Sequence, residues 1–229
     1  EEFLQDYFLP CLHANCIYEG RYLLGTSIAR PLISKHHVRI AHEHGANTVC
    51  HGATGKGNDQ VRFELGYQAL DADLEILAPW KNTDFIEQFA SGRKTMLDYC
   101  EKHGLEAKAS RSKPWSSDDN LLHISYEAGV LEDPWVTAPD EIFERMVHPT
   151  QAPDEVERFI IHWEQGVPVK VSSCTTKPGK FEDIDIEIAE PADTLAEGLL
   201  SVFEYVDEAA ARNGVGSLGM VETRYVGMK

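Results

Sequence analysis

The chain has 229 residues, of which 42% are hydrophobic and 26% charged, a composition typical of an ordinary globular protein with one large domain or parts of two. Its apolar runs are too short to cross a bilayer, and its formal net charge of −17, with no basic stripe, argues against nucleic acid as a partner. The five cysteines form no C-x-x-C pair, which argues against a zinc site or a disulfide framework and favours a reducing cytoplasm.

The first half of the chain has the pattern of a βαβ unit. The expected elements are helices over 1–17 and 27–44, a strand over 46–50, a glycine-rich loop over 51–58, a helix that begins at 58 or 59, and a strand over 74–78. Thr26 and Ser27 are possible caps of the second helix, and Gly45 is placed to end it. Strand, glycine loop, helix and strand in this order predict a parallel α/β arrangement.

The second half has a different character, and we place a domain boundary near residue 101, giving domains 1–101 and 102–229. The expected elements are a helix over 92–103, a loop over 110–119, a strand over 121–126, a hairpin of 156–163 with 167–171, a strand over 184–188, a helix over 192–213 and a strand over 218–226. Gly104 and Gly214 are placed to end the two helices. This half is expected to be α+β.

The segment from Gly52 to Asp59 is the most informative on physical grounds. Its glycines free several backbone N–H groups to point at one anion just before a helix N-terminus, which is typical of a cradle for phosphate or carboxylate. The loop is not a Walker A motif, because Asn58 follows Gly57 where that motif needs Lys and then Ser or Thr. A flexible βα turn without a ligand is the alternative.

A metal site is not indicated by the histidines, which are the other candidate ligands. Four of them fall on the second expected helix, where they scatter around the surface: His36, His37, His42 and His44. A solvated helix face explains them.

Two longer strings resemble the argininosuccinate synthase family nearly letter for letter. They are Tyr-Leu-Leu-Gly-Thr-Ser-Ile-Ala-Arg-Pro at 22–31 and His-Gly-Ala-Thr-Gly-Lys-Gly-Asn-Asp-Gln-Val-Arg-Phe-Glu at 51–64. The resemblance continues through Ala-Pro-Trp at 78–80, Pro-Trp-Ser at 114–116, Asn-Leu-Leu-His-Ile-Ser-Tyr-Glu-Ala-Gly at 120–129, Gly-Val-Pro-Val at 166–169, and the end of the chain at 221–222 and 227–229. It covers essentially the whole chain.

That resemblance implies an incomplete adenine nucleotide alpha hydrolase-like domain of the ATP-pyrophosphatase type, with a parallel sheet, followed by an α+β synthetase domain. It also implies an ATP-dependent, cytoplasmic ligase of arginine biosynthesis and the urea cycle that joins citrulline to aspartate, uses Mg²⁺ with the nucleotide, and assembles as a homotetramer. The implied citrulline contacts are Tyr22, Ser27, Asn58, Arg62, Ser116, Ser125 and Glu222. The implied aspartate contacts are Thr54, Asn58 and Asp59, and the implied ATP contacts are Gly52, Thr54, Gly55 and Lys56.

Each of these residues has a plainer explanation. Ser27 and Asn58 are possible helix caps, Arg62 a solvated helix charge and Tyr22 a core aromatic. Asp59 falls in the first turn of an expected helix, where a carboxylate stabilises the helix dipole even without a ligand.

The chain departs from the family pattern in ways that leave other functions open. We expect it to be an internal section, because the family's Ser-Gly-Gly-x-Asp-Thr-Ser ATP loop is not in the sequence and Glu1 is not a natural start; alone, the chain is expected to be inactive. Thr223 stands where the family usually has Asn. The alternatives are a non-catalytic citrulline or aspartate binding remnant, and another member of the ATP-pyrophosphatase class.

Overall fold

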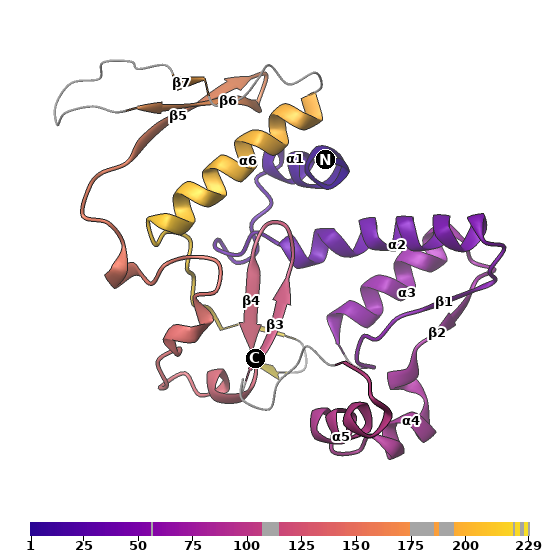
Figure 1. Ribbon diagram of the computed structural model, residues 1–229. Coiled ribbons are helices and arrows are strands. Elements are labelled where there is room, and N and C mark those ends of the chain that lie inside the picture. The colour runs from indigo at the N-terminus through magenta and orange to yellow at the C-terminus, as the bar shows by residue number, and fades with distance from the viewer. Residues whose placement is uncertain are drawn as a thin grey trace. The chain divides into compact units, whose positions relative to one another are not determined.

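The computed structural model (Figure 1) describes residues 1–55, 57–106, 115–174, 186–187, 195–221, 223–224 and 227–228. They form two compact units: Glu1–Leu24 with Pro134–Lys229, and Gly25–Asp133. The domains expected from the sequence, 1–101 and 102–229, are a different division of the chain and stay a prediction. Among the residues described, no helix combines the length and the apolar character that a membrane span needs.

The unit Gly25–Asp133 contains the expected βαβ arrangement. Its elements are α2 (Gly25–Glu43), β1 (Thr48–Cys50), α3 (Asn58–Leu70) and β2 (Glu75–Leu77). Strands β1 and β2 pair in parallel, with Val49 opposite Ile76, so the predicted parallel crossover is confirmed. The glycine-rich loop therefore leaves the carboxyl end of β1 and runs directly into the N-terminus of α3, where α/β folds bind ligands.

A small apolar core joins the two helices to the strands. Val38 and Ala41 of α2 pack with Val49 of β1 and Tyr67 of α3, and each is at most 5% exposed. Where α2 and α3 cross, Gly66 faces Ser34, whose buried hydroxyl has no hydrogen-bond partner among the described residues. A Cβ at Gly66 would lie 2.6 Å from the Ser34 oxygen, so glycine sets the close approach of the helices.

We expect Gly66→Ala to destabilise this unit. In a helix interior, alanine is normally favoured over glycine by up to about 1 kcal/mol, but overpacking a well-filled contact costs about 1–3 kcal/mol. The steric cost therefore exceeds the gain in helix propensity, and thermal unfolding should show a lower midpoint. Gln68→Ala, on the exposed side of the same helix, is the control and should not lower it. An equal or higher midpoint for Gly66→Ala would contradict the close packing.

The rest of this unit follows β2. A turn at Pro79–Lys81 leads into α4 (Thr83–Gln88) and α5 (Arg93–His103), which ends as predicted at Gly104 with φ of +66°. The loop predicted over 110–119 is wrong for its last four residues: β3 (Ser116–Asp119) pairs antiparallel with β4 (Ile124–Glu127). The purely polar string Ser-Ser-Asp-Asp hides this strand, because its formation depends on the partner strand and not on an apolar alternation.

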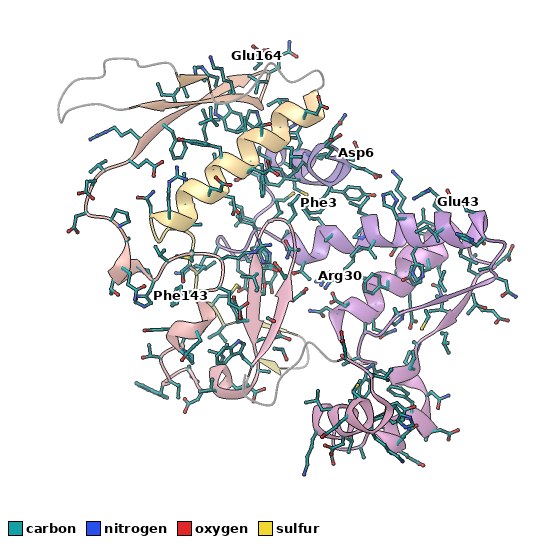
Figure 2. The ribbon with its side chains drawn as sticks, in the orientation of Figure 1. Phe3, Asp6, Arg30, Glu43, Phe143 and Glu164 are labelled. Atoms are coloured by element: carbon teal, nitrogen blue, oxygen red, sulfur yellow. The ribbon has the colours of Figure 1, made fainter. Side chains whose placement is uncertain are left out.

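In the other unit, the N-terminal helix packs on the long C-terminal helix. A π-helical turn (Phe3–Phe8) continues into α1 (Leu9–His13), with Phe3 buried and Asp6 exposed (Figure 2). The Phe8 ring meets the Phe203 ring of α6 (Leu195–Arg212) edge to face, with centroids 5.8 Å apart. The helix expected over 192–213 is thereby confirmed over 195–212, and it ends before Gly214, which has φ of +64°.

The predicted hairpin is present in the same unit. Strands β5 (Arg158–Glu164) and β6 (Val167–Cys174) pair antiparallel, with Gln165 and Gly166 at positive φ in the turn. Strand β7 (Ile186–Glu187) adds to the edge of β6. By contrast, the strand expected over 218–226 is wrong for residues 218–221, which are irregular. Within the expected range, Thr223–Arg224 forms the strand β8, which pairs with β9 (Gly227–Met228), and residues 222, 225 and 226 lie outside the described residues.

Candidate functional site

Two glycines of the glycine-rich loop pack closely against neighbouring atoms. A Cβ at Gly55 would lie 2.7 Å from the Trp80 carbonyl oxygen, and one at Gly57 would lie 2.9 Å from the Thr54 hydroxyl oxygen. The Gly57 N–H donates to the Thr54 carbonyl at 3.1 Å, closing a turn just before α3. Gly52 and Thr54 are exposed. The described residues of the loop therefore form a defined turn in which Gly52 and Thr54 face solvent.

His51, at the start of the loop, contacts both the loop and helix α3. Its ring is buried and stacks on Phe63 of α3, and its Nδ1 accepts a hydrogen bond from the Ala53 N–H at 3.3 Å. His51 Nε2 lies 3.5 Å from Glu64, whose two carboxylate oxygens accept from Lys81 Nζ at 3.0 Å. Burial alone would raise the pKa of Glu64, but hydrogen bonds from Gln60, Lys81 and His51 lower it below its usual value.

Two plainer explanations do not match the helix starts. Helix α2 begins at Gly25, so Thr26 and Ser27 lie inside its first turn and do not cap it from outside. The cap residue of α3 is Gly57, so Asn58 is the first helical residue, with an exposed side chain. Pro31 lies inside α2 and has no N–H to donate to the Ser27 carbonyl. The Ser27 carbonyl therefore lacks the hydrogen bond that it would otherwise accept from the residue four positions later.

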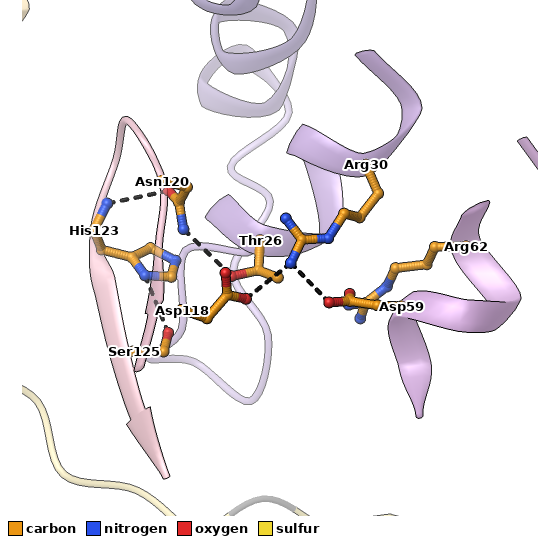
Figure 3. Close-up of polar contacts among 8 residues, drawn as sticks. All are labelled: Thr26, Arg30, Asp59, Arg62, Asp118, Asn120, His123 and Ser125. Atoms are coloured by element: carbon orange, nitrogen blue, oxygen red, sulfur yellow. Dashed lines mark hydrogen bonds and ion pairs between the residues drawn. The ribbon is translucent and has the colours of Figure 1, made fainter. Parts of the chain in front are cut away.

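The electrostatic centre of the site is Arg30, on the next turn of α2. Its Nη2 donates to Asp59 Oδ2 of α3 at 2.7 Å and to Asp118 Oδ2 of β3 at 3.0 Å (Figure 3). Arg62 Nη1 donates to the other Asp59 oxygen, Oδ1, at 3.1 Å. The Arg30 side chain is 11% exposed, and its guanidinium lies over the Phe63 ring, 5.6 Å from the centroid. The result is a chain of four alternating charges across α3, α2 and β3.

These partners fix the charges at neutral pH. Burial alone would raise the pKa of Asp59, but hydrogen bonds and charge from Arg30, and then from Arg62, lower it below the usual carboxyl value. Likewise, burial would lower the pKa of Arg30, but Asp59 and Asp118 raise it. Asp59 is therefore a carboxylate and Arg30 a guanidinium throughout the physiological range.

A pH dependence of stability follows from the lowered pKa of Asp59. A carboxyl whose pKa is lower in the folded than in the unfolded state contributes stability above the unfolded value of about 3.9 and loses it as pH falls through the folded value. We expect Asp59→Asn to lower the free energy of unfolding at pH 6, and the gap from wild type to shrink as pH falls below 4. Chemical unfolding at pH 6 and at a pH below 4 measures the difference in the free energy of unfolding between the two proteins. Asp73→Asn, an exposed control, should show a smaller gap at pH 6; a gap for Asp59→Asn that does not shrink would contradict the pairing.

The β3–β4 hairpin presents the two predicted serines on one face. Asp118 pairs with Ser125 and Ser116 with Glu127 in the antiparallel register. Because paired residues share a face and alternate residues along a strand return to it, Ser116, Asp118 and Ser125 point to the same side. That side is the one that Asp118 turns toward Arg30.

The hairpin is also tied to the first turn of α2. Asn120 Nδ2 donates to the Thr26 hydroxyl at 3.3 Å, and the Asn120 side-chain oxygen accepts from the N–H of His123 at 3.2 Å. A Cβ at Gly25 would lie 2.6 Å from the His123 ring, so the hairpin rests directly on the start of this helix. His123 Nδ1 lies 3.2 Å from the hydroxyl of Ser125 (Figure 3). The polar contacts thereby reach Ser125, one of the residues predicted to bind citrulline.

Most of the residues singled out from the sequence therefore belong to one unit. The structure brings Asp59 and Arg62 into contact and places the other members on the loop and elements around them: Ser27, Gly52, Thr54, Gly55, Asn58, Ser116 and Ser125. Tyr22 belongs to the other unit, where it forms a turn with Tyr18. Lys56 and Glu222 lie outside the described residues, so their predicted roles stay predictions.

The helix histidines bond to separate partners. His37 Nδ1 lies 2.9 Å from the Tyr67 hydroxyl, and His42 Nε2 lies 2.7 Å from an Asp71 oxygen. Within the described ranges, no three His, Cys, Asp or Glu side chains converge as metal ligands.

Sequence reasoning assigned no role to Arg30, Asp118, Asn120 or His123. Arg30 lies one helical turn after Ser27 in the first family-like string, and Asn120 and His123 lie in a later one, whereas Asp118 falls between two of the strings. Their contacts join residues up to 94 positions apart, which no local pattern reveals.

Comparison with known proteins matches both parts of the chain to one family. Residues 1–106 match the arginosuccinate synthase N-terminal HUP domain, and residues 115–229 match the arginosuccinate synthase C-terminal domain. The chain is 48% identical over 229 residues to the argininosuccinate synthase of Desulfatibacillum aliphaticivorans, 46% over 228 to that of Thermotoga petrophila, and 43% over 228 to that of Gallus gallus.

Each of these alignments covers all of this chain but only 51–52% of the relative, so the chain spans about half the length of the curated relatives it matches. The expected fold class, an α/β nucleotide-binding-type region followed by a second domain, is confirmed by the two matched domains and the parallel β1–β2 pair. The chain belongs to the argininosuccinate synthase family.

Proposed function

We propose that this chain carries the amino-acid site of an argininosuccinate synthase, a ligase that joins citrulline to aspartate at the expense of ATP. The observation that supports it most is the convergence at Arg30: the N-terminus of α3, the first turns of α2 and the serine face of the hairpin meet around alternating charges. Two zwitterionic amino acids require such a mixture of fixed cations and anions.

Aspartate binds at the start of α3 in this proposal. Its carboxylates face the N-terminus of the helix, where Thr54 and Asn58 are exposed and the helix dipole favours an anion. Its ammonium faces Asp59. A carboxylate offers about four acceptor positions, and Arg30 and Arg62 take one on each oxygen, so acceptor capacity remains for the substrate.

Citrulline binds between Arg62 and the hairpin. Arg62 uses one of about five N–H donors on Asp59, which leaves donors for the citrulline carboxylate. Ser116 and Ser125 supply hydroxyls from the hairpin face, and Ser27 with its freed carbonyl supplies polar atoms from α2. Tyr22 and Glu222 are further citrulline contacts that the family resemblance implies.

ATP lies along the glycine-rich loop, with Gly52, Thr54, Gly55 and Lys56 as contacts. Mg²⁺ comes with the nucleotide, since this ion is usually bound through substrate phosphates and water rather than by an all-protein cage. We assign it no protein ligand.

The residues of the chain act mainly by positioning and by stabilising charge. The ureido oxygen of citrulline attacks the α-phosphorus of ATP, a P–O bond forms, and pyrophosphate leaves with the electrons of the broken P–O bond. The aspartate amine then attacks the ureido carbon of the adenylate and AMP leaves. Asp59 holds that amine beside the site and accepts hydrogen bonds from its ammonium until it is deprotonated for attack.

The same proposal covers the setting of the enzyme. Arginine biosynthesis follows from the family, and we further propose a role in the urea cycle where one operates, a cytoplasmic location and a homotetrameric assembly. Light scattering on the full-length product of the gene that encodes this chain tests the assembly.

Product analysis tests the activity. The full-length gene product, incubated with citrulline, aspartate and ATP, should form argininosuccinate, AMP and pyrophosphate in equal amounts. Binding of citrulline or aspartate in calorimetry without any of these products would instead favour the non-catalytic binding protein. Absence of both binding and products would remove the proposal.

A further inference from the structure

Arg30 is the residue that the proposed chemistry does not yet use. It is more buried than Arg62, at 11% against 33% side-chain exposure, and it is the link between two elements that carry different substrate residues. Asp59 lies on α3 with the aspartate residues, and Asp118 lies on the hairpin with Ser116 and Ser125. Both carboxylates take their hydrogen bonds from the same nitrogen, Arg30 Nη2.

The guanidinium of Arg30 is largely enclosed by protein, with 11% of the side chain exposed. The Phe63 ring lies against it, and Nε is buried with no hydrogen-bond partner among the described residues. A solvated surface arginine needs neither feature. The two carboxylates would also repel each other without the cation between them, because both approach one nitrogen within 3.0 Å.

We propose that Arg30 is the positioning residue of the ligation site: it sets the distance between the aspartate subsite on α3 and the citrulline subsite on the β3–β4 hairpin. This rests on the proposed function. Asp59 faces the substrate amine and Arg30 holds Asp59, so Arg30 acts on the reaction through other residues.

Lysine is a poor substitute at this position. A guanidinium is planar and stacks on an aromatic ring, whereas an ammonium is a compact, strongly hydrated charge on a shorter reach. Arg30→Lys should therefore restore part of the function lost in Arg30→Met, because it keeps the charge between Asp59 and Asp118 but not the plane.

The test is a set of Michaelis constants measured on the full-length gene product. Arg30→Met should raise the KM for aspartate and for citrulline about tenfold or more each, because each subsite loses a charge-assisted hydrogen bond. The KM for ATP should stay within about twofold, since the contacts described for Arg30 are to Asp59, Asp118 and Phe63 and not to the described residues of the glycine-rich loop. Arg30→Lys should lie between wild type and Arg30→Met.

Arg39→Met is the matched control. Arg39 lies on the same helix and pairs with Glu43 at 2.5 Å, but its side chain is 54% exposed, and its substitution should leave all three constants unchanged. A purely structural role for Arg30 predicts a different pattern: the active fraction falls and the three Michaelis constants of the remaining enzyme do not change. That pattern would overturn the proposal.

Asp118→Asn separates the two halves of the link. It removes a charge from the hairpin side without touching Asp59, so the KM for citrulline should rise more than the KM for aspartate. The opposite order would overturn the assignment of the hairpin to citrulline.

Calorimetry with citrulline and aspartate, in the presence of a non-hydrolysable ATP analogue, distinguishes failure of this proposal from failure of the function. If the wild-type protein binds both amino acids and Arg30→Met binds them as Arg39→Met does, only the role of Arg30 is overturned. If the wild-type protein binds neither, the proposed function and the role of Arg30 fall together.

Discussion

Asp59→Asn in the full-length gene product should raise the KM for aspartate on the order of 100-fold, because the substrate ammonium loses its anionic partner in a half-buried site. Citrulline-dependent exchange of pyrophosphate into ATP should continue at about the wild-type rate. The reason is chemical order: formation of the adenylate precedes the attack of aspartate, so a residue whose substrate contact is with aspartate is not needed for exchange. Steady-state kinetics and isotope exchange measure the two quantities separately.

The control for this prediction is Asp73→Asn, which removes an exposed carboxylate from the same unit and should change neither quantity. Loss of exchange together with aspartate use would show that Asp59 also supports adenylation, and the division between the two subsites would then be wrong.

Arg62→Ala should raise the KM for citrulline about tenfold to 100-fold, the effect expected when a carboxylate loses charge-assisted hydrogen bonds. The KM for aspartate should rise less, because Arg62 is only one of two arginines on Asp59, and Arg30 remains. The KM for ATP should change least. Initial rates with each substrate varied in turn give the three values.

Arg39→Ala serves as the matched control for Arg62→Ala. Both arginines lie on helices of the same unit, and each pairs with a carboxylate one turn away on its own helix. Equal increases in the KM for citrulline and for ATP would contradict a citrulline role for Arg62. Restoration of most of the citrulline affinity by Arg62→Lys would show that a point charge suffices and that the forked geometry does not matter.

The βαβ region could be predicted from the sequence because its signals are local. Gly45 follows α2, a short string at 46–50 that ends in Val-Cys precedes a glycine loop, and Gly104 ends α5 in the left-handed conformation that glycine adopts at least cost. Errors arose where structure depends on a distant partner. Strand β3 has no apolar residue and exists through its pairing with β4. The strand expected over 218–226 failed at residues 218–221 for a local reason: Gly219 weakens an extended segment.

The site divides in the same way. The glycine-rich loop ahead of a helix predicted an anion site from local sequence alone, and the family resemblance implied Thr54, Asn58, Asp59 and Arg62 as its members. Arg30 could not be identified, because an arginine on a helix resembles a solvated charge until Asp118, 88 residues away, is known to face it. The strings that resemble the family contain Arg30, but a string does not say which members touch substrate and which hold the others in place.

Transfer of an oxygen isotope tests the central claim most directly. Citrulline labelled with ¹⁸O in its ureido group, given to the full-length gene product with ATP and aspartate, should deliver the label to the phosphate of AMP, because the attacking oxygen stays on the α-phosphorus when AMP leaves. Label found in pyrophosphate, or lost to water with none in AMP, would contradict the citrullyl-adenylate and with it the ligase reaction proposed for this site.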